Sequence, residues 1–470
     1  MADNRQFRSD AAVMSMRFRV LPRTCIALLL ATPVAGQTAL ARPDSTPRNL
    51  PQTFAILRNA LPRGDQQTVR RALEIARRFA PDDGTVLVFL ARAQAATGDP
   101  TAALQTLERL AVQGAVLKLE SDSSFKSLRV APYEKRFAAV TRRLERATAP
   151  IVRSDTAFAL ADPDFIPEGI AHDPSSGAAY IGSLTGRGVL RLTSDGRATP
   201  FLTPGSDVPA QILGIRIDAT AHRLWLAALT PDSTAPRFEN GPGGWAALHA
   251  YDLTSGALLA RYPAPDSTRP HLLNDIAITP NGDAYVTDSE GRGVYRLRAG
   301  AARLEPIAAD PLLFNYPNGV TVTPNGARLY VAHMEGVSTL DLRARNARLE
   351  RVLSPRGVST GGIDGLYMCD GALYAVQALY GFQQVTRFPL SGNGRRVLRA
   401  EALERRHPAH EIATTGAFAR GGLLYIANAQ IGRLTPTGSA LPTDHPAPSV
   451  ILRLPVGHHC ERSPTSSQTR

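Results

Sequence analysis

Four short segments in the second half of the chain each place an oxygen-bearing side chain just before an apolar stretch. The segments are Pro167-Glu168-Gly169-Ile170, Leu273-Asn274-Asp275-Ile276, Pro317-Asn318-Gly319-Val320 and Ile363-Asp364-Gly365-Leu366. Two carboxylates and two amides are oxygen ligands of the kind that a hard cation such as calcium prefers. We therefore predict a site for Ca²⁺, or for another divalent cation, whose ligands are Glu168, Asn274, Asn318 and Asp364.

The spacing of these segments predicts the fold that would bring them together. The last three are separated by 318 − 274 = 44 and 364 − 318 = 46 residues, close to the length of one propeller blade. Two further segments begin in a similar way, Ile212-Leu213-Gly214-Ile215 and Thr414-Thr415-Gly416-Ala417. Six such units predict a mainly β protein with a six-bladed β-propeller over residues 157–457, in which each segment opens the first strand of a blade.

The same topology predicts which residues surround the ion. Successive strands of a blade are antiparallel, so the end of the second strand lies on the same face as the start of the first. A cation there would polarise the carbonyl group of an ester or lactone, and a general base would activate water. The candidates for that base are Asp364, if it also holds the ion, and His333 or His271 nearby.

Residues 50–146 have a different periodicity and predict a small all-α domain. Val69, Leu73 and Ala76 recur 34 residues later as Ala103, Leu107 and Leu110. That period is typical of tetratricopeptide helix pairs. Because the array is short, we interpret it as a capping or docking module that packs on the propeller and offers a surface for a protein partner.

The N-terminus predicts export. Arginines precede the apolar run Cys25–Ala31, and Ala39-Leu40-Ala41 offers small residues for a signal peptidase, so residues 1–41 are interpreted as a signal peptide. The run is too short to span a bilayer, so no transmembrane segment is expected in the mature chain, which would be periplasmic or secreted. The net charge of +12 is spread over scattered arginines without a run, and we expect no nucleic-acid partner.

Two cysteines, Cys369 and Cys460, follow the predicted cleavage site. In an oxidising compartment they could form a disulfide, and the alternative is a buried residue at Cys369 with a free thiol in a mobile tail. The polar residues 458–470 are predicted to form a disordered tail.

At these motifs the chain from about Asp162 to Val456 resembles the family of senescence marker protein 30, gluconolactonase and related lactonases, and more distantly the paraoxonases. The resemblance implies Glu168, Asn318 and Asp364 as ligands of a divalent metal, with Asn274 facing the substrate and Asp364 as the base. Sugar-lactone enzymes of this family tend to carry an arginine before that asparagine. Here Leu272 and Leu273 precede it, which favours an apolar lactone or ester.

Two other functions share this fold. One is a propeller that binds a ligand or a protein partner and keeps the metal only for structure. The other is a condensing enzyme similar to strictosidine synthase, which would need an acidic residue late in the propeller. Glu411 is the nearest candidate for that residue.

Overall fold

The computed structural model describes most of the chain after the N-terminal segment. The described residues are 47, 53, 56–57, 59–60, 63–79, 81, 84–113, 119–120, 122–205, 207–238, 243–309, 316–334, 336–345, 348–378, 382–435, 438–444, 447–457 and 460. The predicted signal peptide and residues 461–470 of the predicted tail lie outside them. In the part described, no helix is both long and apolar enough to cross a membrane.

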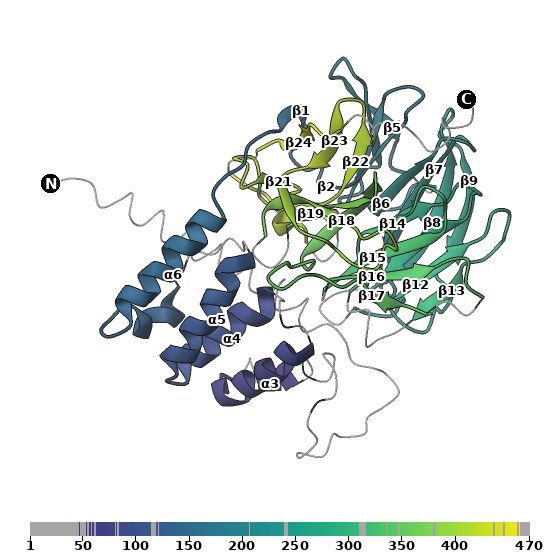
Figure 1. Ribbon diagram of the computed structural model, residues 1–470. Helices are drawn as coiled ribbons and strands as arrows, with labels where there is room; N and C mark the ends of the chain where they lie inside the picture. Colours follow the sequence, from purple (N-terminus) through teal and green to yellow (C-terminus); the bar gives the residue numbers. More distant parts are fainter. Residues whose placement is uncertain are drawn as a thin grey trace.

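The helical region precedes the propeller and lies beside it (Figure 1). Its elements are α3 (Gln66–Phe79), α4 (Gly84–Ala96), α5 (Pro100–Gln113), the 3-10 helix η1 (Ser123–Leu128) and α6 (Glu134–Ala147). Asp99 begins α5, because its carboxylate accepts a hydrogen bond from the Ala102 amide at 3.0 Å and Pro100 occupies the first helical position. Helix α5 starts 100 − 66 = 34 residues after α3, as the sequence period predicts. The tetratricopeptide assignment itself stays a prediction.

The chain then crosses to the propeller through a linker that blade five holds in place. The Glu404 carboxylate is fully buried and accepts hydrogen bonds from the Ser154 amide at 2.9 Å and the Ser154 hydroxyl at 2.6 Å. The Arg405 guanidinium donates to the carbonyl of Ala147, the last residue of α6, at 2.6 Å. The C-terminal end of α6 is therefore bound to the propeller directly.

Among the described residues, twenty-four strands form six four-stranded sheets, which confirms the six-bladed propeller. Blade one contains β2 (Pro167–His172), β3 (Ala179–Ser183), β4 (Val189–Leu192) and β5 (Ala198–Leu202), and blade two contains β6 (Gln211–Asp218), β7 (Arg223–Pro231), β8 (Gly244–Asp252) and β9 (Leu258–Pro263). Blade three contains β10 (Leu273–Ile278), β11 (Ala284–Asp288), β12 (Gly293–Leu297) and β13 (Glu305–Ala309), and blade four contains β14 (Val320–Val322), β15 (Arg328–His333), β16 (Gly336–Asp341) and β17 (Glu350–Arg351). Blade five contains β18 (Ile363–Cys369), β19 (Ala372–Gln377), β20 (Gln384–Pro389) and β21 (Glu401–Arg405).

The sixth sheet closes the ring with a strand from the other end of the chain. Strands β22 (Gly416–Ala419), β23 (Gly422–Ile426) and β24 (Ser449–Leu454) are completed by β1 (Asp155–Leu160), which pairs antiparallel to β24. The short 3-10 helix η2 (Ile431–Arg433) lies between β23 and β24. This closure joins the two ends of the propeller through backbone hydrogen bonds, so no sheet is left to open at the seam.

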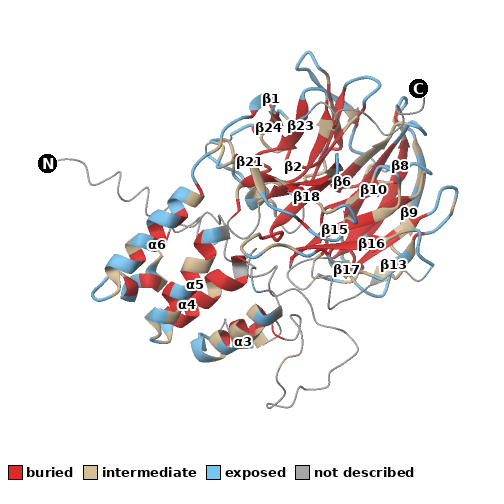
Figure 2. Cartoon of the chain, in the orientation of Figure 1, coloured by how far each residue is buried: buried red, intermediate tan, exposed pale blue. Residues whose placement is uncertain are grey.

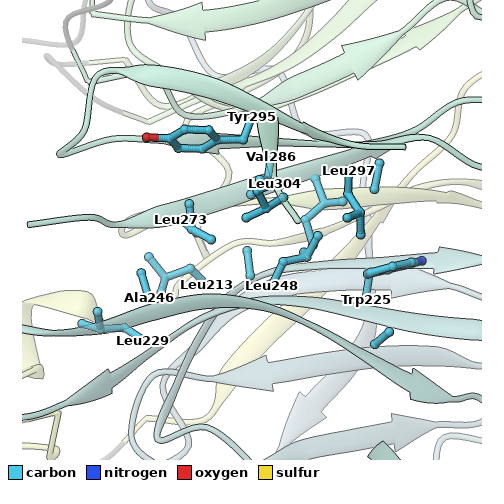
Figure 3. Close-up of a cluster of buried hydrophobic side chains, with 14 of the residues drawn as sticks. Leu213, Trp225, Leu229, Ala246, Leu248, Leu273, Val286, Tyr295, Leu297 and Leu304 are labelled. Atoms are coloured by element: carbon cyan, nitrogen blue, oxygen red, sulfur yellow. The ribbon is translucent and has the colours of Figure 1, made fainter. Parts of the chain in front are cut away.

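Apolar side chains from neighbouring blades pack between the sheets. Figure 3 shows one such cluster, in which Leu213, Trp225 and Leu248 of one blade meet Leu273 and Val286 of the next. Inner strands are buried almost throughout, whereas outer strands such as β9 alternate between intermediate and exposed residues (Figure 2). The core is therefore a ring of interfaces between blades, and the inner strands around the axis are held in fixed relative positions.

Cys369 and Cys460 form a disulfide between the end of β18 and the C-terminal segment, with a Cα–Cα distance of 5.5 Å. Cys460, which the sequence placed in the tail, is thus attached to blade five.

We expect the Cys460→Ser variant to be less stable than the wild type. The disulfide joins positions 91 residues apart, and closing so long a loop restricts the unfolded chain. The free energy of unfolding, measured in urea, should fall by about 2–4 kcal/mol. A reducing agent should lower it similarly in the wild type and leave the variant unchanged, and an equal effect on both proteins would contradict the prediction.

Candidate metal centre

The predicted ligands stand where the inner strands are irregular. The pairing of β2 with β3 shifts between Pro167 and Ile170, that of β10 with β11 between Leu273 and Ile276, and that of β18 with β19 between Ile363 and Leu366. Each β-bulge contains one of the predicted ligands, namely Glu168, Asn274 and Asp364. A bulge turns a side chain away from the regular alternation, so these residues can face the propeller axis.

The glycines that follow the ligands let the inner strands approach each other. A Cβ atom on Gly319 would overlap with the carbonyl oxygen of Asp364 in the next blade. A Cβ on Gly169, which follows Glu168, would likewise overlap with the carbonyl oxygen of Leu213 in the next blade. The Asn318-Gly319 pair is thus not simply a turn former, because its glycine brings the backbone of one ligand-bearing strand against that of the next.

Three of the predicted ligands have a buried oxygen without a hydrogen-bond partner. These atoms are Oε2 of Glu168, Oδ1 of Asn318 and Oδ1 of Asp364. Their residues are 6%, 6% and 5% exposed. A buried acceptor without a donor is costly and rare in folded proteins, and a cation would supply the missing partner. Two carboxylates and an amide are also the ligand types that suit Ca²⁺, so these residues fit such an ion.

The electrostatics of the two acids agree with this arrangement. Burial, followed by the negative charge of Asp275, raises the pKa of Asp364 to about 7, and the Asn318 side chain opposes the shift. Burial, followed by the charge of Asp364, raises the pKa of Glu168 well above its usual value. Each acid is therefore hard to ionise without a nearby positive charge.

Asn274, the fourth predicted ligand, is buried and oriented by a serine. Its amide nitrogen donates to the Ser289 hydroxyl at 3.0 Å, and that hydroxyl donates to the Pro317 carbonyl at 2.7 Å. The Ser289 contact engages the nitrogen, which leaves the amide oxygen as the atom that can bind a cation or a ligand. The serine links the blade of Asn274 to the segment that carries Asn318.

The two candidate histidines are both buried and hydrogen-bonded. His271 uses both ring nitrogens, Nδ1 with the Asp288 carboxylate and Nε2 with the Asp266 carbonyl at 2.6 Å. His333 ends β15 and its Nε2 lies 2.9 Å from the Ser338 hydroxyl. His271 would have to break an existing contact to accept a proton. Asp364 is the candidate base with an unpartnered oxygen.

The hub, by which we mean the buried polar residues around Glu168, Asn318 and Asp364, also contains Asp275 and Arg216. The sequence analysis did not identify these two residues as a pair. Asp275 is 3% exposed and accepts hydrogen bonds from the amides of Val320 at 3.0 Å and Ile276 at 2.8 Å. Arg216 lies 3.5 Å from this carboxylate, and its Nε donates to the Ile276 carbonyl at 2.8 Å. Burial raises the pKa of Asp275, and the guanidinium opposes that shift. An arginine at the centre of β6 was the available signal, because a charged side chain on a buried inner strand needs a partner.

The comparisons with known proteins find similar solved structures. A gluconolactonase from Xanthomonas campestris is 19% identical, with 65% of this chain and 97% of that chain covered and a TM-score of 0.43. The calcium-binding protein regucalcin from Agrobacterium tumefaciens is 18% identical, with coverage of 65% and 96% and a TM-score of 0.43. An inactive variant of virginiamycin B lyase from Staphylococcus aureus is 12% identical, with coverage of 64% and 98% and a TM-score of 0.41. No protein-family profile and no curated protein matches the chain.

Stabilisation of the protein by Ca²⁺ is expected to increase between pH 5 and pH 8. The pKa of Asp364 is raised to about 7 in the folded protein from an ordinary 3.8, so ionising it costs the ion-free fold stability. That cost is absent near pH 4 and complete above pH 7, and a bound cation removes it. The difference in Tm with calcium and with chelator should grow over this range. It should grow less in Asp364→Asn, in which Glu168 still titrates, and grow as in the wild type in Asp341→Asn, a surface control.

Arg216→Met should destabilise the protein mainly at high pH. The substitution leaves the Asp275 carboxylate buried without its cation, which we expect to cost about 3 kcal/mol at pH 8 and less at pH 5, where the acid can take up a proton. Arg296→Met is the matched control, because Arg296 is 24% exposed against 23% for Arg216 and its partner Glu305 lies nearer the surface. Equal, pH-independent losses in urea unfolding of the two variants would contradict this role.

Proposed function

We propose that the protein is an exported, calcium-dependent hydrolase of a lactone or ester. The observation that carries this proposal is the set of three buried, unpartnered oxygens on Glu168, Asn318 and Asp364 at the propeller hub. Such a set suits a cation, and a divalent cation supplies Lewis-acid polarisation of a carbonyl group when bound. Asn274 would be the fourth ligand or the residue that faces the substrate.

The residues of the hub divide the remaining work. Glu168 and Asn318 would hold the ion through their unpartnered oxygens. Asp364 would be the general base, because a carboxylate beside the substrate can take a proton from water. Ser289 fixes the amide of Asn274, so that residue can orient the substrate. The products would be a hydroxyl group and a carboxylic acid, with water as the co-substrate.

The substrate class follows from the residues around Asn274. Leu272 and Leu273 precede it, and Leu273 is fully buried while Leu272 is partly buried. Neither of these two positions holds an arginine, which could bind a phosphate group or several hydroxyl groups of a sugar. We therefore favour an apolar lactone or ester over a sugar lactone. Glu411 is exposed, which disfavours it as the buried acid of a condensing enzyme.

Export is proposed on two independent features. The N-terminal apolar run with its small-residue site is typical of a signal peptide. The disulfide between Cys369 and Cys460 is of a type that persists in oxidising compartments.

A propeller that binds a ligand or a partner and keeps the ion only for structure is the second candidate. Hydrogen bonds already engage His271 and His333, which leaves Asp364 as the main candidate base. This shortage of candidate bases favours the second function. In that case Asp364 would be a ligand alone.

Asp364→Asn is expected to abolish hydrolysis while calcium still binds with reduced affinity. An amide oxygen can bind the ion but cannot take a proton at neutral pH. Turnover of a panel of aryl esters and lactones, with and without chelator, measures activity, and calorimetry measures calcium binding. We expect a loss in kcat of at least about 100-fold. The surface variant Asp341→Asn should retain activity.

The two functions give different results in this experiment. A wild-type protein that binds calcium and turns over no ester or lactone would support the binding propeller. A wild-type protein that binds no divalent cation would overturn both.

A further inference from the structure

Two residues of the propeller belong to the hydrophobic cluster of the helical region. The cluster contains Val69 and Leu73 of α3 and Leu90 of α4, and Met334 of the propeller is buried in it at 6% exposure. Tyr316 packs against the same cluster. Met334 directly follows His333 at the end of β15, and Tyr316 precedes Asn318 by two residues. The helical region therefore packs on the face of the propeller that carries the predicted ligands.

Tyr316 connects this cluster with the candidate metal centre. Its backbone has a φ of +54°, a left-handed conformation that is unfavourable for a bulky residue and persists where packing holds it. Tyr316 thus packs on the helices at a position two residues before the predicted ligand Asn318.

A second contact lies in the segment that connects blade four to blade five. Gly357, between β17 and β18, has a φ of +80°, and a Cβ atom on it would lie 3.0 Å from Cγ1 of Val112 in α5. The helices therefore meet the propeller near the segments that lead into β14 and β18, and near the loop that follows β15. Figure 1 shows the helices gathered on one side of the propeller.

We propose that the helical region forms the outer wall of the hub site, and that Tyr316 and Met334 are specificity-determining residues that limit the size of the substrate. This inference rests on the proposed function, because it concerns access to the same ion and carbonyl group. Short acyl groups fit beneath the wall, and long ones collide with the ring of Tyr316 and the side chain of Met334. The helices serve here as part of the site.

The wall itself is tested by hydrogen–deuterium exchange, which requires neither metal nor turnover. Met334→Glu places a charge in the shared cluster and should increase exchange in peptides from α3 and α4. Met368→Glu is the matched control, because Met368 is a partly buried methionine of β18 that packs against the cluster between blades four and five, away from the helices. Met334→Ala should act in the same direction if the Glu variant does not fold. Unchanged exchange in α3 and α4 in both Met334 variants, or equal increases in the control, would overturn the proposal.

The size limit is tested with p-nitrophenyl acetate and p-nitrophenyl decanoate. The ratio of kcat/KM for the long ester to that for the short one should rise by about tenfold in Met334→Ala and in Tyr316→Ala. It should stay at the wild-type value in Met368→Ala, and also in Tyr316→Phe, which keeps the ring. A ratio that none of these variants changes would overturn the size limit. If the wild type hydrolyses neither these esters nor any lactone of the panel, the proposed function fails, and the exchange experiment alone decides whether the wall exists.

Discussion

The structure depends on how the negative charge buried at the propeller axis is compensated. Glu168, Asp275 and Asp364 come from three different blades, and burial raises the pKa of each of them. Arg216 lies beside Asp275. Placing two further carboxyl groups in such surroundings is unfavourable unless they stay protonated or meet a cation. Our proposal takes the second solution, because both residues have an unpartnered oxygen that a cation would bind.

The blades produce this convergence with simple means. A bulge at the start of an inner strand turns the ligand toward the axis, and the glycine beside it lets the next strand approach closely. Side-chain contacts then join neighbouring blades, as in the hydrogen bond from the Thr287 hydroxyl to the Asn318 carbonyl at 2.8 Å. Pairing of β1 with β24 closes the ring, so the six sheets keep their positions around the axis. The site is therefore a property of the whole ring, since removing one blade contact would shift a ligand held by another.

The sequence predicted the fold well because its signals were local and repeated. The six segments that open the blades, the alternation of apolar residues and the 34-residue period all depend on near neighbours, and the structure confirms the propeller and the preceding helices. The partnership of Arg216 with Asp275 depends on contacts between blades that have no fixed spacing, so it could not be predicted. The same is true of Tyr316, whose importance arises from contacts with helices far away in sequence. The roles of the predicted ligands remain predictions, although their oxygens are buried as that role requires.

The contacts that attach the helices to the propeller favour a rigid helical region rather than a mobile one. At one end, Arg405 binds the carbonyl of Ala147, and Ile151 pairs with Arg405 through hydrogen bonds of 2.9 and 2.8 Å. The chain then enters β1, which is itself part of a blade. At the other end, Met334 is buried in the cluster of α3 and α4. Because the helical region is held at both ends, it can move relative to the propeller only by exposing buried apolar surface or by breaking the backbone pairing at Ile151. Both changes cost free energy. The helices therefore have the rigidity that a specificity-determining wall needs, because a wall that moved freely would not select between acyl groups of different length.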